Sequence, residues 1–242
     1  GHGCTQPGEG KITFGTGAFA LALTGHAPLL GNSAGLLPTV AWQLNQSQPL
    51  YALDGGVYNA ASAINWLRSL GLFQDYAELN QFDQPSALSR GLVFVPALSG
   101  LACPHWDRQA AGLWIGMGLD TRREDLLQSA LEGVALCAAE VLRALAQHLP
   151  LGACISVDGG MAHNPYFLQF LADATQKTLR IPASTQLTAL GTARLALLGS
   201  GIGTLPALPE PAKSIKPGAP LGRAGFECFS DAVQRAKAWR KN

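Results

Sequence analysis

The apolar residues of this chain change from strand-like to helical spacing near residue 57, and this change limits the fold classes that the chain can adopt. Short apolar runs bounded by Gly, Pro or Asn are typical of strands, and they lie at 11–24, 37–43, 50–53, 92–95, 114–116, 153–157 and 179–181. Helical spacing sets in near residue 57, and from there helices alternate with the later runs. Strands first and then alternating helices and strands predict a layered α/β fold.

Helical spacing covers 57–70, 121–148, 164–176, 187–198 and 230–240. The longest of these segments opens with Thr121 and Glu124, whose T-x-x-E spacing predicts a capping box that satisfies free backbone N–H groups. Residues 206–220 are rich in proline and are expected to form a surface connection. The 242 residues allow one large domain or two small ones, and without an internal repeat or a linker we expect a single domain, 1–242.

The charge of the chain is close to balanced. Lys and Arg number 17 and Asp and Glu number 16, which gives a formal charge of +1. Such a balance lacks the basic patch with which proteins bind nucleic acid or anionic lipid, so neither is expected as a partner. No apolar run reaches the ~18 residues of a membrane span. Because only 14% of the residues are charged, we expect an apolar face that another part of the protein or a second subunit covers.

The cysteines are odd in number and far apart, which argues against disulfides and zinc. They are Cys4, Cys103, Cys137, Cys154 and Cys228, with no C-x-x-C pair. Buried free thiols are typical of a reducing compartment, so we expect the protein in the cytoplasm.

The first glycine turn, Gly15-Thr16-Gly17, lies between two strand-like runs. Two glycines bring backbone N–H groups and one hydroxyl close to a ligand without obstruction, and phosphate oxygens suit such a turn. An ordinary hairpin turn with a flanking bulge is the alternative.

The second glycine turn follows the run at 153–157. Gly159 and Gly160 let a ring or ribose approach the main chain, and the helix that starts at Asn164 offers free N–H groups. Asn164 is also a good N-cap and Pro165 suits the first helical position, so a tight strand-to-helix turn is the alternative. No G-x-G-x-x-G or P-loop pattern is present.

A long apolar loop at 96–107 carries two polar candidates. His105 has the chemistry of a base and Asp107 that of a carboxylate ligand. A lone His beside a Trp is more often structural, and no Ser/His/Asp spacing supports acyl transfer.

The motifs, taken in order, resemble one known family. They are Gly15-Thr16-Gly17-Ala18-Phe19, 61–67 (ASAINWL), 94–101 (FVPALSGL), 103–107 (CPHWD), 131–133 (LEG), 157–160 (VDGG) with Asn164, 188–193 (TALGTA) and 216–218 (KPG). This order is similar to the C-terminal half of the FGGY carbohydrate kinases, nearest to the members that phosphorylate glycerol. The resemblance runs almost from end to end and implies an actin-like, ribonuclease H-like ATPase domain with a mixed sheet flanked by helices.

The resemblance also implies roles for single residues. Gly15, Thr16 and Gly17 would lie at the ATP phosphates, whereas Gly159, Gly160 and Asn164 would border the adenosine. Ala61 and Asn65 stand where the family has Gly and Gln, which alters the edge of the nucleotide pocket. Phe19 matches the aromatic residue that packs on the carbon skeleton of the polyol.

Other parts of the family's machinery are expected outside this chain. The family's general base is an Asp that would lie seven residues before Gly1, and a separate N-terminal lobe binds most of the polyol. No catalytic residue and no metal ligand are therefore assigned here, and the isolated fragment is expected to be inactive. The implied reaction transfers the γ-phosphate of Mg-ATP to a polyol hydroxyl, in a protein that is expected to be a homo-oligomer.

Two alternatives stay open. The parent protein can act on a pentulose or hexonate instead of glycerol, although the G-T-G turn and the apolar loop at 100–104 are on the glycerol side. His105 and Ala111 stand where Tyr and Arg are usual, and Leu119-Asp120-Thr121 replaces an R-G-T. The altered Ala61 and Asn65 also allow a degenerate module that binds nucleotide without turnover.

Overall fold

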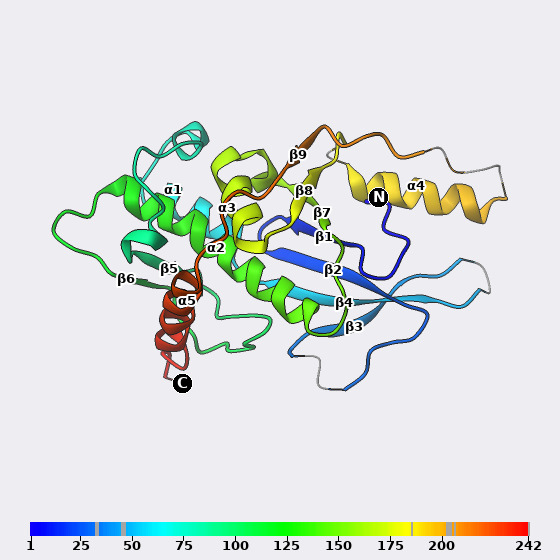
Figure 1. The fold of residues 1–242 in the computed structure, drawn as a ribbon, viewed down its shortest axis with the longest axis horizontal. Helices are drawn as coiled ribbons and strands as arrows, with labels where there is room; N and C mark the ends of the chain where they lie inside the picture. Colours follow the sequence, from blue (N-terminus) through cyan, green and yellow to red (C-terminus); the bar gives the residue numbers. More distant parts are fainter. Residues whose placement is uncertain (32–33, 45–46, 185, 202–204, 206, 242) are drawn as a thin grey trace.

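The fold is built on one seven-stranded sheet, seen in a computed structural model that describes residues 1–242 apart from 32–33, 45–46, 185, 202–204, 206 and 242 (Figure 1). The strand order is β3-β4-β2-β1-β7-β8-β9. The strands are β1 Gly10–Phe14, β2 Ala18–Gly25, β3 Leu37–Trp42, β4 Leu50–Val57, β7 Cys154–Gly159, β8 Thr178–Ile181 and β9 Lys213–Ile215. The strands expected in the first third and at 153–157 and 179–181 are thus confirmed.

The sheet is mixed, and its register sets the geometry of the site. Strand β1 pairs antiparallel with β2, and Phe14 lies opposite Ala18 at the turn between them. On its other side β1 runs parallel to β7, where Phe14 lies beside Gly159. Because β1 and β7 are parallel neighbours, their carboxyl ends lie side by side, and so do the two glycine turns that follow them.

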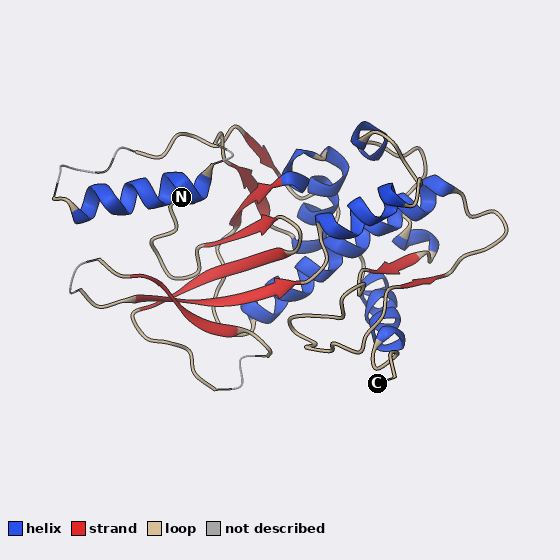
Figure 2. Ribbon diagram, turned by 180° about the vertical axis from the view of Figure 1, so that it is seen from behind, coloured by secondary structure: helices blue, strands red, loops and turns tan. Residues whose placement is uncertain are grey.

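Helices α2 Arg123–Ala146 and α3 Pro165–Thr175 pack on one face of the sheet (Figure 2), and α1 Ala61–Ser69, which follows β4, packs against α2. Side chains alternate along β1, so Ile12 and Phe14 point into this layer and are almost fully buried. Phe14 meets Phe167 of α3 edge-on, with ring centroids 4.9 Å apart. Burial of apolar area between the sheet and these helices is the main stabilising contribution of the fold.

The opposite face of the sheet is partly open. Helix α4, Leu187–Gly199, lies over it beside the N-terminal segment (Figure 1). Phe19 on β2 and Leu37 on β3 point to this face and are 54% and 51% exposed. An apolar face was expected from the low charge of the chain, and this face is apolar only in part, because it also carries Lys11 and Asp54.

A second, two-stranded sheet lies at the other end of the molecule. It consists of β5 Val93–Val95 and β6 Leu113–Ile115, and helix α5, Arg223–Ala236, packs against it. The short 3₁₀ helices are η1 Tyr76–Leu79, η2 Leu88–Arg90 and η3 Gly160–His163.

Several expected boundaries are wrong. The first helix begins at Ala61 because β4 continues to Val57. The last helix covers Arg223–Ala236 instead of 230–240, and the exposed Trp239 lies beyond it. The connection at 206–220, whose first residue is outside the described part, contains the edge strand β9.

The capping box predicted at Thr121 and Glu124 is also wrong. The Thr121 hydroxyl accepts a hydrogen bond from the Gly118 N–H, so it serves the preceding turn. Helix α2 begins one residue later, and Asp125 accepts from the Arg122 N–H at 2.8 Å. The carboxylate that closes the first turn therefore lies one position further along.

The structure bears on the predicted state of the cysteines and on membrane-spanning helices. All five cysteines are free thiols, as predicted, but only Cys103 and Cys137 are buried. Among the described residues, no helix has the length and apolar character to cross a membrane.

Candidate functional site

The first glycine turn holds the start of helix α1. The carbonyl oxygen of Thr16 accepts hydrogen bonds from the Ala60 and Ser62 N–H groups at 3.0 and 3.1 Å, and that of Gly15 accepts from Ala61 at 3.1 Å. The turn thus satisfies N–H groups that are usually free at a helix start. Its own amide N–H groups and the exposed Thr16 hydroxyl are the groups left for a phosphate.

The two glycines of the second turn differ in their surroundings. Gly159 has φ +95°, and a Cβ there would lie 2.1 Å from the carbonyl oxygen of Phe14, so no other residue fits beside β1. Gly160 has nothing within 4 Å of an added Cβ. Gly159 therefore serves packing between strands, whereas Gly160 leaves open space at the mouth of a cavity.

That cavity, which we call the α1/η1 cavity, has a volume of about 500 Å³. It is lined by Ala61, Ile64, Asn65, Tyr76, Ala77, Leu79, Asn80, Leu131, Gly160, Met161, His163 and Asn164. Four residues that the resemblance assigned to the nucleotide, Ala61, Asn65, Gly160 and Asn164, thus line one space. Its volume is in the range of small-ligand pockets, and its lining is largely apolar with a few polar groups.

Asn164 joins two walls of the α1/η1 cavity. Its Oδ1 accepts from the Phe167 N–H at 2.7 Å, which confirms it as the N-cap of α3. Its Nδ2 donates to the carbonyl oxygen of Leu79 at 2.8 Å. Asn164 therefore supports the cavity through its side chain, in addition to bordering it.

The η1 wall was not found from sequence. Tyr76, Leu79 and Asn80 come from a segment without helical period. The sequence does contain one indication of this turn, because Asp75 and Glu78 have the spacing of a capping box. They form that capping box in the structure. Such a box predicts a short helical turn but not what the turn packs against.

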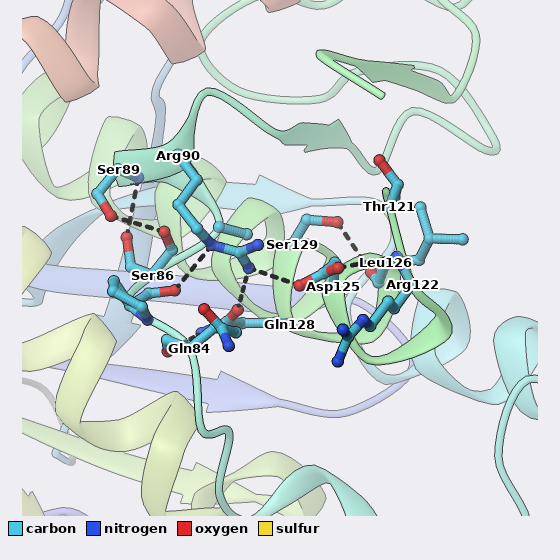
Figure 3. Close-up of polar contacts among 12 residues, drawn as sticks. Gln84, Ser86, Ser89, Arg90, Thr121, Arg122, Asp125, Leu126, Gln128 and Ser129 are labelled. Atoms are coloured by element: carbon cyan, nitrogen blue, oxygen red, sulfur yellow. Dashed lines mark hydrogen bonds and ion pairs between the residues drawn. The ribbon is translucent and has the colours of Figure 1, made fainter. Parts of the chain in front are cut away.

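Arg90 fastens the neighbouring loop to helix α2 (Figure 3). Its guanidinium donates to Asp125 and to the Gln128 side chain, both at 2.8 Å, and its Nε donates to the Pro85 carbonyl oxygen. Gln128 in turn donates to the carbonyl oxygen of Gln84 at 3.3 Å. The loop that follows the η1 wall is held through these contacts on a rigid helix.

Glu132 is a buried carboxyl group in the same assembly, next to the cavity-lining Leu131. It accepts hydrogen bonds from the Ala87 and Leu88 N–H groups at 2.9 and 2.7 Å and from the Tyr166 hydroxyl. Burial raises the pKa of Glu132 to about 7, and these hydrogen bonds offset part of that effect. The carboxyl group thus links α2 to α3 and to the start of η2.

The open face of the sheet carries charged groups beside Phe19. Lys11 donates to the Thr13 hydroxyl at 3.0 Å. Burial would raise the pKa of Asp158, but the neighbouring side chains of His2, whose Nε2 lies 3.5 Å from Oδ1, and Thr13 outweigh it and hold the pKa below the usual value. Burial also raises the pKa of Asp54, in spite of the nearby Lys11 ammonium. The open face of the sheet thus presents the exposed Phe19 ring beside the charged groups of Lys11, Asp54 and Asp158.

The two candidates in the 96–107 loop are structural. His105 pairs through Nε2 with Glu140 at 3.0 Å. Asp107 accepts from the backbone N–H groups of Ala238, Gln109 and Ala110, and these bonds lower its pKa. Across the described ranges, no three His, Cys, Asp or Glu side chains gather in a way that could hold a metal.

A mixed sheet flanked by helices, with glycine turns where β1 and β7 end, has the fold of the actin-like ATPase class. Residues 10–200 match the C-terminal domain of the FGGY family of carbohydrate kinases, and the chain belongs to this family.

Known relatives agree with this assignment. The chain is 40% identical to a glycerol kinase of Thermus brockianus over 99% of this chain and 49% of that protein. It is similar to the crystal structure of Plasmodium falciparum glycerol kinase with ADP, with a TM-score of 0.82 and 28% identity over 96% of this chain and 47% of that one. A xylulose kinase from Rhodospirillum rubrum shares the fold, with a TM-score of 0.74 and 24% identity over 97% and 47% of the two chains. The chain spans about half the length of the curated relatives it matches.

Proposed function

We propose that this chain is the ATP-binding lobe of a kinase that transfers the γ-phosphate of ATP to a hydroxyl of glycerol. The observation that carries the proposal is the meeting of the Gly15-Thr16-Gly17 turn and the α1/η1 cavity at the start of one helix. One site takes the phosphates and the other the nucleoside. Glycerol kinases among the relatives support the choice of acceptor.

The residues of this chain act mainly by positioning. Thr16 and the turn N–H groups would hold the phosphate oxygens, and Gly15 and Gly17 keep side chains out of the way. Gly160, Asn164, Ala61 and Asn65 would hold the nucleoside, whereas Gly159 packs β7 against β1 beside them. Phosphoryl transfer needs little covalent chemistry from the protein, so alignment and charge stabilisation account for most of the rate.

The acceptor would approach over the open face of the sheet. Phe19 is more than half exposed there and offers an apolar surface for a carbon skeleton. We infer that a second lobe covers this face, supplies the general base and excludes water from the transferred phosphate. Mg²⁺ would neutralise phosphate charge when bound.

We also propose a cellular compartment and an oligomeric state for the protein. Five free thiols suit the reducing cytoplasm. The exposed apolar residue Val40 on the edge strand β3 suits self-association.

Two other functions rest on specific observations. The fold is shared with a xylulose kinase, so a pentulose or hexonate is the second candidate acceptor. Ala61 and Asn65 depart from the residues that the resemblance predicts, so a module that binds nucleotide without turnover is the third.

The test uses the protein at its full natural length. A coupled ADP-release assay with glycerol, xylulose and gluconate is expected to show turnover with glycerol. Turnover with another acceptor alone would replace the substrate, and tight ATP binding without turnover would support the third candidate. The 242-residue chain by itself is expected to bind ADP and to transfer no phosphate, and turnover by that chain would overturn the proposal.

A further inference from the structure

Asn59 is a buried polar side chain in the short segment between strand β4 and helix α1. Its Oδ1 accepts a hydrogen bond from the Ser99 N–H at 2.9 Å. Its Nδ2 donates to the Ser62 and Ser99 hydroxyls at 3.1 and 3.3 Å. Both hydrogens of the amide are therefore used, so the Asn59 side chain cannot turn without leaving a buried polar group unpaired.

The segment around Asn59 also holds the first glycine turn. Ser62, whose hydroxyl bonds Asn59, donates its backbone N–H to the carbonyl oxygen of Thr16 at 3.1 Å. A Cβ on Gly17 would lie 2.5 Å from the carbonyl oxygen of Val57, so the turn packs directly on the end of β4. The turn thus contacts the chain both before and after Asn59, and its position depends on where Asn59 holds this segment.

The loop that carries Ser99 is itself held in place. Within the loop, the backbone groups of Leu101 and Asp107 bond each other in both directions, at 2.7 and 2.9 Å. The Arg240 guanidinium, from the segment after α5, donates to the carbonyl oxygen of Leu98 at 2.8 Å. Since Leu98 directly precedes Ser99, the bonds between Ser99 and the Asn59 side chain come from a supported backbone.

Other roles do not account for the contacts of Asn59. It is not the N-cap of α1, because Ala60 has that position and the helix has no side-chain cap. It does not line the α1/η1 cavity either. A buried hydrogen bond adds little net stability, whereas a fully paired buried network fixes one arrangement of the elements that it joins. The elements joined by Asn59 are helix α1, the first glycine turn and the loop that carries Ser99.

We propose that Asn59 is a positioning residue for phosphate binding, which holds the start of helix α1 and the first glycine turn at a fixed place against the loop that carries Ser99. Asn59 acts through Ser62 and Thr16 instead of contacting the nucleotide. Misplacement by about 1 Å at a site of group transfer can lower the rate about a hundred-fold, so a fixed turn matters for the reaction. This inference rests on the proposed nucleotide function and adds the side chain that orients the phosphate site.

The experiment measures ADP affinity by calorimetric titration of the protein at its full natural length, and adenosine affinity by competition with ADP. Asn59→Leu has a side chain of similar size without hydrogen bonds. ADP affinity is expected to fall about ten-fold and adenosine affinity less than about two-fold, because adenosine has no phosphate for the turn to hold.

Arg240→Ala tests the support of the loop at an exposed position. It is expected to lower ADP affinity about three-fold and to leave adenosine affinity unchanged. In the double variant the loss of ADP affinity should not exceed that of Asn59→Leu alone, since Arg240 acts through Asn59. Full additivity of the two losses would contradict this route.

Ser129→Ala is the matched control, because it removes a buried hydroxyl that accepts from the Trp114 indole at 3.1 Å, between α2 and β6. It is expected to leave the ratio of ADP to adenosine affinity unchanged. Thermal unfolding checks the fold of each variant, and Arg240→Ala decides the matter if Asn59→Leu does not fold. If ADP binds well and the folded variants keep the original ratio, or weaken both ligands equally, the inference is wrong and the proposed function stands. If the unmodified protein binds neither ligand, the proposed function and the inference both fail.

Discussion

Asn164 and Leu79 are joined by a hydrogen bond of 2.8 Å between a helix-capping side chain and a backbone carbonyl 85 residues earlier. The same carboxamide caps α3 through the Phe167 N–H. One side chain therefore sets both the start of a helix and the position of the η1 wall, so the shape of the α1/η1 cavity depends on it.

Replacing Asn164 with Ala is expected to affect both stability and binding. The cap and the bridge to Leu79 are lost together, so the free energy of unfolding should fall by about 1–2 kcal/mol. ADP affinity should also fall, because the η1 wall loses its tie to α3. Urea denaturation and calorimetric titration check the two effects. Asn80→Ala, at an exposed neighbour, should leave the free energy of unfolding nearly unchanged, and an equal loss there would contradict this account.

Substitutions at the adjacent Gly159 and Gly160 are expected to have different effects, one on stability and the other on ADP binding. Gly159→Ala places a Cβ against the Phe14 carbonyl oxygen at a positive φ, so it should destabilise the fold by about 2 kcal/mol or more. Gly160→Leu points into open space and should unfold like the unmodified protein, yet it should weaken ADP binding by more than about ten-fold because it fills the cavity. Thermal melts and titrations of both variants separate the two roles. Normal ADP affinity in a folded Gly160→Leu protein would argue against the site.

Glu132 predicts a specific pH dependence of stability. Burial raises its pKa from 4.5 in an exposed chain to about 7 in the folded protein, so folding takes up a proton between these values. The stabilisation is fully present below pH 4.5 and is lost as the pH rises through 7. Relative to Glu132→Gln, the free energy of unfolding of the unmodified protein should therefore fall by up to about 3 kcal/mol between pH 4.5 and 8.

Urea denaturation at several pH values measures this difference. Glu227→Gln, an exposed carboxyl group on α5, serves as the control and should change the pH profile little. A pH-independent difference between the unmodified protein and Glu132→Gln would show that the carboxyl group titrates normally.

Substitution of Phe19 tests whether its ring contributes to acceptor binding and not to the stability of the fold. Its ring is 54% exposed, so Phe19→Ala should change the free energy of unfolding by no more than about 0.5 kcal/mol. If the ring packs on the polyol, the KM for glycerol in the full-length protein should rise about ten-fold. Leu37→Ala, at a similarly exposed position on β3, should leave KM unchanged. An unaltered KM in Phe19→Ala would remove this residue from the acceptor site.

The sequence allowed the Gly15-Thr16-Gly17 turn and the strand–turn–helix unit at Gly159 to Asn164 to be predicted as local structures, because both depend on local chemistry. Glycines, an N-cap and a following proline constrain the backbone within a few residues. Asn164 does cap α3 in the structure, although Gly159 ends β7 instead of lying in the turn.

The η1 wall and strand β9 required tertiary information. Tyr76 reaches the cavity because its segment folds back on α1 and α3, which no local period shows. Strand β9 is three residues long in a proline-rich stretch and exists because it pairs with the edge of β8. Likewise Arg122, whose type is unusual at a helix start, precedes α2 because Asp125 is placed to accept its N–H.

The most direct test of the central claim is hydrogen–deuterium exchange of this chain with and without ADP. The account predicts slower exchange in three separate segments, 15–17 with the start of α1 at 60–66, the η1 wall at 76–80, and 159–166. Protection of these segments together, lost in Gly160→Leu, would place the nucleotide in the α1/η1 cavity. Protection confined to other parts of the chain, at ADP concentrations that saturate binding, would contradict the account.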